Sequence, residues 1–88
     1  MKIFFTTRFR RSYKRLVSRS EELRKIVAER VRLFSENPDT HLLKDHILKG
    51  KLQGYRAFSI GYDLRILYRK EKDVYVFFDI GTHDKIYK

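Results

Sequence analysis

The stretch that decides the fold is "YRAFSIGYDLRILYRKEKDVYVFFDI", residues 55–80. It contains three runs rich in β-branched and aromatic residues, which predict strands over 55–60, 64–70 and 74–80. The connections "GYD" and "EKD" have three residues each. Connections this short allow only hairpins, so the three strands are expected to form an antiparallel meander.

Alternation along these strands predicts which side chains share a face of the sheet. The apolar set expected to meet the helices is Leu64, Ile66, Tyr68, Val74, Val76, Phe78 and Ile80. The opposite face would then carry Arg65 with Tyr75 and Phe77. Guanidinium groups beside aromatic rings suit RNA, because the charges contact phosphates and the rings stack on bases. The alternative is that Tyr75 and Phe77 cover a second small core.

The first half of the chain predicts one strand and two helices. "KIFFT", residues 2–6, is typical of a short strand, and Thr6 or Thr7 can cap the helix that follows. One face of that helix carries Phe9, Tyr13 and Leu16, and the rest is rich in arginine and lysine. "SRSEEL" predicts a break and a new helix, which ends at "SENPD" because Pro38 disfavours a helical residue before it.

These elements predict a single α+β domain over residues 1–88. The order β-α-α-β-β-β places two N-terminal helices on one face of a mostly antiparallel four-stranded sheet. Residues 40–54 show no clear period and are interpreted as a loop.

Charge and composition narrow the possible partners. Lysine and arginine number 21 against 11 acidic residues, giving a net charge of +10. Such a charge attracts polyanions, above all nucleic acid and to a lesser extent an anionic membrane surface; a merely basic protein is the alternative. There is no cysteine, so no disulfide framework is possible. No apolar run is long enough to span a membrane, and "MKIFFTTRFRR" is not typical of a secretory signal. The absence of cysteine fits a reducing cytosol, so a cytoplasmic protein is expected.

Polar residues able to carry chemistry gather in the second half of the chain. They are His46, Arg56, Ser59, Asp63, Arg65, His83 and Tyr87. Two histidines and a carboxylate can transfer protons near neutral pH, and arginines can stabilise charge on a phosphate. These groups suffice for RNA cleavage in which the RNA's own 2′-hydroxyl attacks the phosphate. No metal-site or phosphate-loop spacing is present, so no cofactor is expected.

The stretch "KDHILKGKLQGYRAFSIGYDLRILYRKEKDVYVFFDIGTHDKIY" resembles the C-terminal half of RelE/ParE-superfamily toxins, especially the YafQ-like branch. The resemblance lies in the "DH-x-L-x-G" loop, the "GYR" strand start and the terminal "GTH" before an aromatic residue. It implies a RelE-like fold and the toxin of a type II toxin–antitoxin pair. Such a toxin cleaves mRNA in the A site of the 70S ribosome and is held by an antitoxin, expected to be acidic and to wrap around it.

The resemblance also implies roles for individual residues. His46, Asp63 and His83 match acid–base positions of the branch, Tyr87 matches its terminal aromatic residue, and Arg65 matches a phosphate-binding arginine of RelE. Residues expected to contact the RNA are Lys44, Lys49, Lys51, Arg56, Ser59 and Tyr75.

The chain departs from the branch at three of these motif positions. Ser59 stands where the branch has a further histidine, Leu64 replaces an aromatic residue and Tyr62 replaces a proline. One proton-transfer group and one stacking surface are therefore missing, and Arg65 is expected to compensate electrostatically.

Three other functions remain open from the sequence, one of them a degenerate toxin kept only as a partner in a repressor complex. ParE-like members share the fold and poison DNA gyrase, and fold alone does not decide function. A non-catalytic RNA- or ribosome-binding module would need only the net charge of +10.

Overall fold

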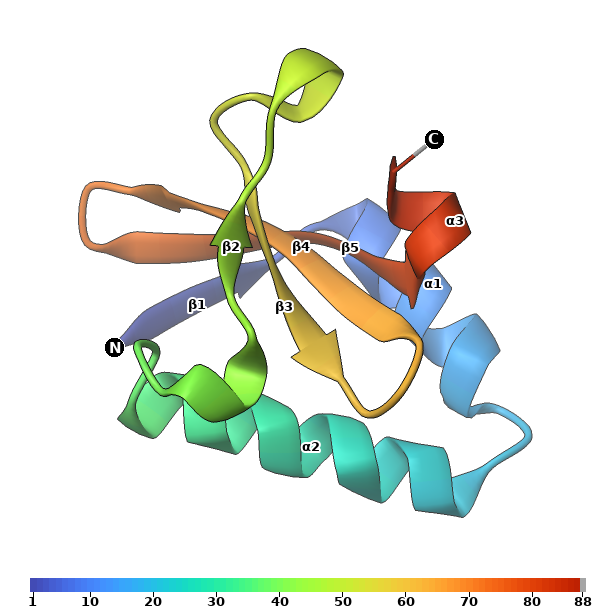
Figure 1. Cartoon of the computed structure of the whole chain (residues 1–88). Helices are drawn as coiled ribbons and strands as arrows, with labels where there is room; N and C mark the ends of the chain where they lie inside the picture. Colours follow the sequence, from blue (N-terminus) through green and yellow to red (C-terminus); the bar gives the residue numbers. More distant parts are fainter. Residues whose placement is uncertain (88) are drawn as a thin grey trace.

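The computed structural model describes residues 1–87, and its elements follow the chain in the order shown in Figure 1. The helices are α1 (Thr7–Val17), α2 (Glu21–Glu36) and α3 (His83–Tyr87). The strands are β1 (Lys2–Phe5), β2 (His46–Ile47), β3 (Arg56–Ile60), β4 (Leu64–Glu71) and β5 (Val74–Thr82). Two 3₁₀ turns, η1 (His41–Leu43) and η2 (Gly50–Leu52), flank β2. Within residues 1–87, no helix has both the length and the apolar character needed to cross a membrane.

The five strands form one mixed sheet in the order β1-β5-β4-β3-β2. β1 runs parallel to β5, and every other pair is antiparallel. The α+β class and the three-strand meander predicted from residues 55–80 are therefore confirmed. The predicted strand count was one too low, because the stretch taken as a loop contributes β2 at an edge. The tail also forms α3, which the turn residues did not predict.

The two N-terminal helices begin at side-chain caps. The Thr6 hydroxyl accepts a hydrogen bond from the Phe9 amide at 3.0 Å and donates to the Phe78 carbonyl of β5 at 2.8 Å. The start of α1 is thereby tied to the sheet. Ser20 caps α2 by accepting from the Leu23 amide at 3.0 Å. α2 ends at Glu36, close to Pro38 as predicted.

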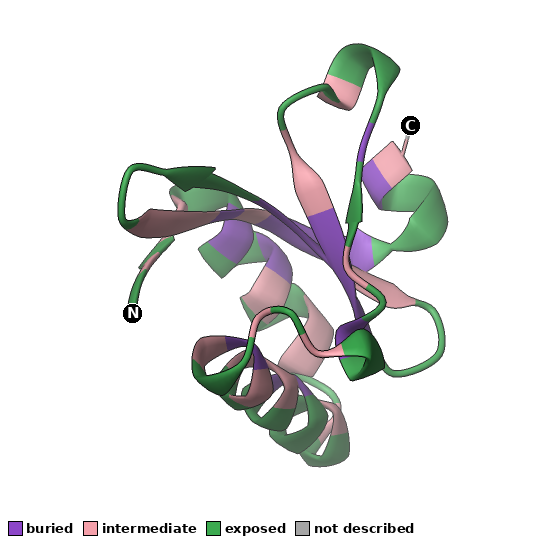
Figure 2. Cartoon of the chain, turned by 60° about the vertical axis from the view of Figure 1, so that its left-hand side comes forward, coloured by how far each residue is buried: buried purple, intermediate pink, exposed green. Residues whose placement is uncertain are grey.

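The main core lies between the sheet and the two long helices, where Figure 2 shows buried residues on the facing sides of both layers. Phe34 of α2 is fully buried at its centre. The centroid of its ring lies 4.7 Å from Phe58, 5.0 Å from Tyr68, 5.1 Å from Tyr75 and 5.4 Å from Phe77. Stacked and edge-on rings at these separations stabilise each other beyond their apolar burial.

The predicted faces of the last strand hold at Ile80 but are wrong for Tyr75, Phe77 and Phe78, and a β-bulge is the reason. Leu67 pairs with Asp79 while Tyr68 pairs with Phe77, so Phe78 is an extra residue on β5. One extra residue inverts the alternation along the rest of the strand. Tyr75 and Phe77 therefore pack in the main core, and Phe78 joins the opposite face.

A second, smaller core covers that opposite face. Its buried members are Leu48, Ala57, Leu67 and Ile86. It attaches the segment around η2 and the C-terminal helix to the sheet, on the side away from α2 (Figure 1). Two segments that carry candidate site residues are thus fixed to one face of the sheet.

Candidate active site

Residues from both attached segments meet around the phenol of Tyr87. The Nε2 atom of His46, from β2, lies 3.0 Å from the Tyr87 hydroxyl oxygen. The other ring nitrogen of His46, Nδ1, lies 3.1 Å from the Lys44 carbonyl oxygen. A carbonyl only accepts hydrogen bonds, so Nδ1 carries a proton. In the neutral ring Nε2 is then the acceptor, and the Tyr87 hydroxyl donates to it.

The backbone of Lys44 explains how its carbonyl reaches the ring. Lys44 follows η1 in the left-handed conformation, with φ 51° and ψ 40°. This conformation turns the chain back within one residue, which places the carbonyl beside the side chain two positions on. Lys44, predicted to contact RNA, thus also orients His46 through its main chain.

His83 lies next to Tyr87 at the start of α3. The centroids of the two rings are 4.4 Å apart, because residues four apart share one face of a helix. The His83 amide donates to the Asp63 carbonyl in the β3–β4 turn at 3.2 Å. Asp63 thus reaches the cluster through its backbone, while its side chain is exposed.

Arg65 approaches the cluster from β4. Burial raises the pKa of Tyr87, and the charge of Arg65 together with its hydrogen bond opposes that rise. Arg65 pairs with Ser59 of β3 on one side and with Gly81 of β5 on the other. Ser59 is 6% exposed, so at most its hydroxyl edge can meet a ligand. The four residues His46, Arg65, His83 and Tyr87 are called the Tyr87 cluster below.

A cavity of about 440 Å³ opens beside the Tyr87 cluster. It is lined by Leu48, Lys49, Lys51, Leu52 and Tyr87. Both lysines are exposed, so they bring two positive charges to a cavity that is also lined by apolar side chains and by Tyr87. An anionic group with an attached ring would find charge and an apolar wall together here.

A second polar cluster, missed by the sequence reasoning, holds the segment that carries His46. Asp45 accepts hydrogen bonds from the Tyr68 hydroxyl and, at 3.2 Å, from Arg56 Nε. Burial raises the pKa of Tyr68, with the hydrogen bond to Asp45 acting in the same direction. The available signal was the acidic residue directly before the histidine in "KDH". Arg56, predicted to contact RNA, is paired with Asp45.

Tyr75 does not belong to the candidate site. It packs on Phe34 on the helix side of the sheet, whereas Arg65 faces away from α2. Its predicted place on the Arg65 face is therefore wrong, for the same reason as the predicted face of Phe77. Among residues 1–87, no three His, Asp or Glu side chains are grouped so that they could hold a metal ion.

The chain is similar to known bacterial toxins along its whole length. Residues 1–88 match the family model described as bacterial toxin of type II toxin–antitoxin system, YafQ. No individual curated protein matches the sequence. The structure is similar to YafQ from E. coli strain BL21(DE3), with a TM-score of 0.82, 21% identity, and coverage of 99% of this chain and 98% of that one.

Two further solved structures extend the comparison. A metal-bound toxin from Helicobacter pylori gives a TM-score of 0.78 at 28% identity, with 99% of each chain covered. The E. coli DinJ–YafQ complex gives a TM-score of 0.76 at 23% identity, with 99% of this chain and 98% of that one covered. Because the family model matches residues 1–88, the chain belongs to the YafQ family of bacterial toxins of type II toxin–antitoxin systems.

Proposed function

We propose that this toxin is a ribosome-dependent endoribonuclease that cleaves mRNA without a metal ion. The single observation that carries the proposal is the Tyr87 cluster, which gathers two imidazoles, a phenol and a guanidinium beside a lysine-lined cavity. These groups can transfer protons and neutralise phosphate charge. Ribosome, mRNA and a cytoplasmic site of action follow from the family resemblance and complete the proposal.

The proposed reaction needs two proton transfers and no external nucleophile. The 2′-hydroxyl of the RNA loses its proton to His46 or Asp63 and attacks the adjacent phosphorus. The bond from phosphorus to the 5′-oxygen breaks, and His83 gives that oxygen a proton. The products are a 2′,3′-cyclic phosphate and a free 5′-hydroxyl, so the atoms balance.

Charge and stacking complete the proposed site. Arg65 stabilises the negative charge that develops on the phosphate, and Lys49 and Lys51 contact neighbouring phosphates. The ring of Tyr87 orients a base of the substrate by stacking, while its hydroxyl holds His46.

Cleavage by variant proteins in a purified translation reaction tests this function. His83→Ala and Arg65→Ala are expected to lower the rate of mRNA cleavage by about a hundredfold or more, given the usual contribution of one acid–base group. Removing transition metals from the protein with a chelating resin should leave the rate unchanged. Undiminished cleavage by both variants would overturn the assignment, and inhibition of gyrase supercoiling without cleavage would favour the ParE-like alternative. Toxicity and RNA binding that survive both substitutions without cleavage would favour the non-catalytic module.

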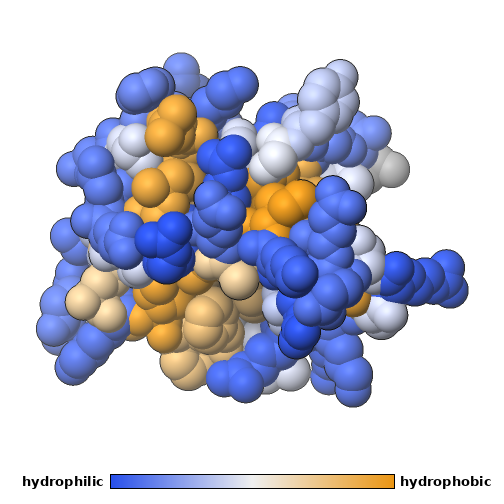
Figure 3. Space-filling view, turned by 90° about the horizontal axis from the view of Figure 1, so that it is seen from below, coloured by the Kyte–Doolittle hydropathy of each residue, from blue (hydrophilic) through white to orange (hydrophobic). Residues whose placement is uncertain are grey.

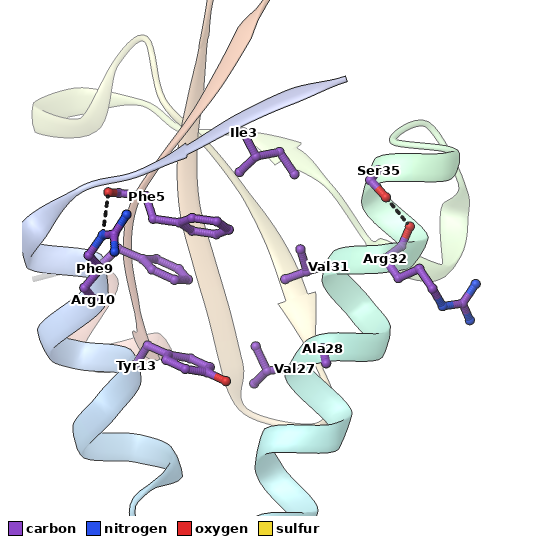
Figure 4. A pocket seen from close by; sticks show the side chains of 10 residues that line it. All are labelled: Ile3, Phe5, Phe9, Arg10, Tyr13, Val27, Ala28, Val31, Arg32 and Ser35. Atoms are coloured by element: carbon purple, nitrogen blue, oxygen red, sulfur yellow. Dashed lines mark hydrogen bonds between the residues drawn. The ribbon is translucent and has the colours of Figure 1, made fainter.

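We further propose that the antitoxin occupies an apolar groove on the opposite side of the molecule. The groove lies between β1, α1 and α2, has a volume of about 640 Å³, and is shown from close by in Figure 4. Its apolar lining includes Ile3, Phe5, Phe9, Val27 and Val31. Figure 3, which views the molecule from below, shows apolar side chains surrounded by hydrophilic ones. We call the groove with this lining the α1–α2 groove.

Charge complementarity points to an acidic occupant of the α1–α2 groove. Arg10 and Arg32 line it, and α1 has no acidic residue in its eleven positions. β1 is the outer strand next to the groove, so its free edge can pair with an extended segment. An acidic antitoxin segment with an apolar face would therefore fit here, and an antitoxin seated in the groove leaves the Tyr87 cluster on the other side of the sheet.

A further inference from the structure

The short helix that carries His83 and Tyr87 is anchored by a buried charge cluster. Lys85 extends from α3 so that its Nζ lies 2.8 Å from the Ser12 hydroxyl of α1 and 3.6 Å from the Asp79 carboxylate. Asp79 is 1% exposed. Its carboxylate accepts hydrogen bonds from the Ser12 hydroxyl at 2.6 Å and from the Ile80 amide at 2.9 Å.

The environment of Asp79 makes the position of Lys85 specific. A buried carboxylate requires compensating positive charge and hydrogen bonds. Arg8 donates to the second carboxylate oxygen at 3.1 Å, and Lys85 supplies the other positive charge. The two cations come from two helices, Arg8 from α1 and Lys85 from α3, and both helices pack against β5. Lys85 therefore has a defined place in the fold, although its side chain is 38% exposed.

Gly81 creates the space through which Lys85 reaches this cluster. A Cβ atom on Gly81 would lie 2.6 Å from Lys85 Cδ and 3.3 Å from its Cγ. Real Cβ atoms do not approach other carbons this closely, so the aliphatic part of Lys85 lies directly on the backbone of β5 at Gly81. A side chain at position 81 would therefore force the aliphatic part of Lys85 to shift.

The orientation of α3 depends on such anchors. A helix of five residues does not persist through its own hydrogen bonds. Ile86 is buried in the second core, and Lys85 fixes the neighbouring side of the helix. The rings of His83 and Tyr87 lie side by side on the helix, so a rotation of α3 would carry the Tyr87 hydroxyl away from His46.

We propose that Lys85, Asp79, Ser12 and Gly81 are positioning residues that hold α3 so that the Tyr87 hydroxyl, with His83 beside its ring, reaches His46. This inference rests on the proposed ribonuclease function. Within residues 1–87, none of the four is hydrogen-bonded to the Tyr87 phenol or to a histidine ring; they act through the helix.

The test compares Lys85→Met with Lys25→Met, which removes the same charge from an exposed position on α2. Lys85→Met is expected to lower the single-turnover rate of mRNA cleavage by about ten- to a hundredfold, the effect of a displacement near 1 Å. The affinity of Lys85→Met for the ribosome should stay unchanged. The nuclear Overhauser effect between the His46 and Tyr87 rings, called the ring contact below, should weaken in NMR spectra. Lys25→Met should alter neither the rate nor the contact.

Gly81→Ala supplies an independent arm. It should lower the rate in the wild-type background and have little further effect in a Lys85→Ala background, where no side chain remains to be displaced. If thermal denaturation shows that Lys85→Met is not folded, Ser12→Ala is used in its place. Full activity with an intact ring contact in the folded variants would overturn the inference. If the wild-type protein does not cleave mRNA, the proposed function fails, and the ring contact alone decides whether the four residues position α3.

Discussion

The Nε2 atom of His46 and the hydroxyl of Tyr87 lie 3.0 Å apart, although 41 positions separate the two residues in the chain. Because Nδ1 of the same ring donates to the Lys44 carbonyl, both ring nitrogens of His46 are engaged. The protonation pattern of the neutral ring is therefore set by the protein. The nitrogen available for chemistry is the one that contacts the phenol.

Replacing Tyr87 by phenylalanine separates the role of the ring from that of the hydroxyl. Tyr87→Phe keeps a stacking surface but removes the donor that orients His46. The loss of one hydrogen bond worth about 1 kcal/mol is expected to slow mRNA cleavage about fivefold. Single-turnover cleavage on programmed ribosomes measures the effect.

Tyr62→Phe is the matched control for this substitution. Tyr62 is 98% exposed in the β3–β4 turn, so Tyr62→Phe also removes a phenol hydroxyl, but one outside the Tyr87 cluster. Its cleavage rate should equal that of the wild type. An unchanged rate for Tyr87→Phe would mean that only the ring of Tyr87 contributes.

Asp45→Asn is expected to destabilise the fold. The Asp45 side chain is 13% exposed and accepts from Arg56 and from the Tyr68 hydroxyl. An amide keeps an acceptor but leaves Arg56 without its counter-charge, so the free energy of unfolding should fall by about 1–3 kcal/mol. Urea denaturation measures the change. Asp73→Asn, in the exposed β4–β5 turn, should change the unfolding free energy little; equal values for both variants would contradict a stabilising role for Asp45.

Alkaline pH should weaken the fold through Tyr68. Burial, helped by Asp45, raises the pKa of Tyr68 above the value of about 10 that an unfolded tyrosine has. A group with a raised pKa contributes stability that is complete below the unfolded pKa and is lost as pH rises toward the folded pKa. The free energy of unfolding should thus fall above pH 10 by about 1.4 kcal/mol per pH unit from this group.

The measurement is urea denaturation between pH 8 and pH 11. Tyr68→Phe has no ionisable hydroxyl at this position, so its unfolding free energy should fall less steeply above pH 10. Tyr62→Phe, which removes an exposed hydroxyl, should follow the wild type. Parallel curves for Tyr68→Phe and the wild type would show that the burial of this phenol does not govern alkaline unfolding.

The fold was predictable where a local pattern determines it. The short connections at 61–63 and 71–73 leave no choice but hairpins, and Thr6 and Ser20 cap their helices in the usual way. The bulge at Phe78 was not predictable, because an unbroken apolar run is compatible with either alternation. Only packing around Phe34 distinguishes them.

The candidate site was predictable in its residues more than in its connections. The histidines and Tyr87 stand out because titratable and aromatic groups occur at segment ends. The hydrogen bond between His46 and Tyr87 depends on α3, and five residues carry no helical period long enough to recognise. Lys85 looked like one more surface charge, since nothing in the sequence places it on Asp79.

The last prediction concerns the α1–α2 groove, where Ala28 lines the wall as an exposed residue of α2. Ala28→Glu introduces bulk and a negative charge, so it should weaken binding of an acidic antitoxin at least tenfold, whereas Ala28→Lys adds similar bulk with a favourable charge and should weaken binding less. Titration calorimetry with the protein encoded by the neighbouring reading frame measures the affinity of both variants.

The control is Lys25→Gln, which makes the same change in charge as Ala28→Glu but lies outside the lining of the groove. All three variants should still cleave mRNA at the wild-type rate, because the groove and the Tyr87 cluster lie on opposite sides of the sheet. Equal affinity for Ala28→Glu and Lys25→Gln would place the antitoxin elsewhere.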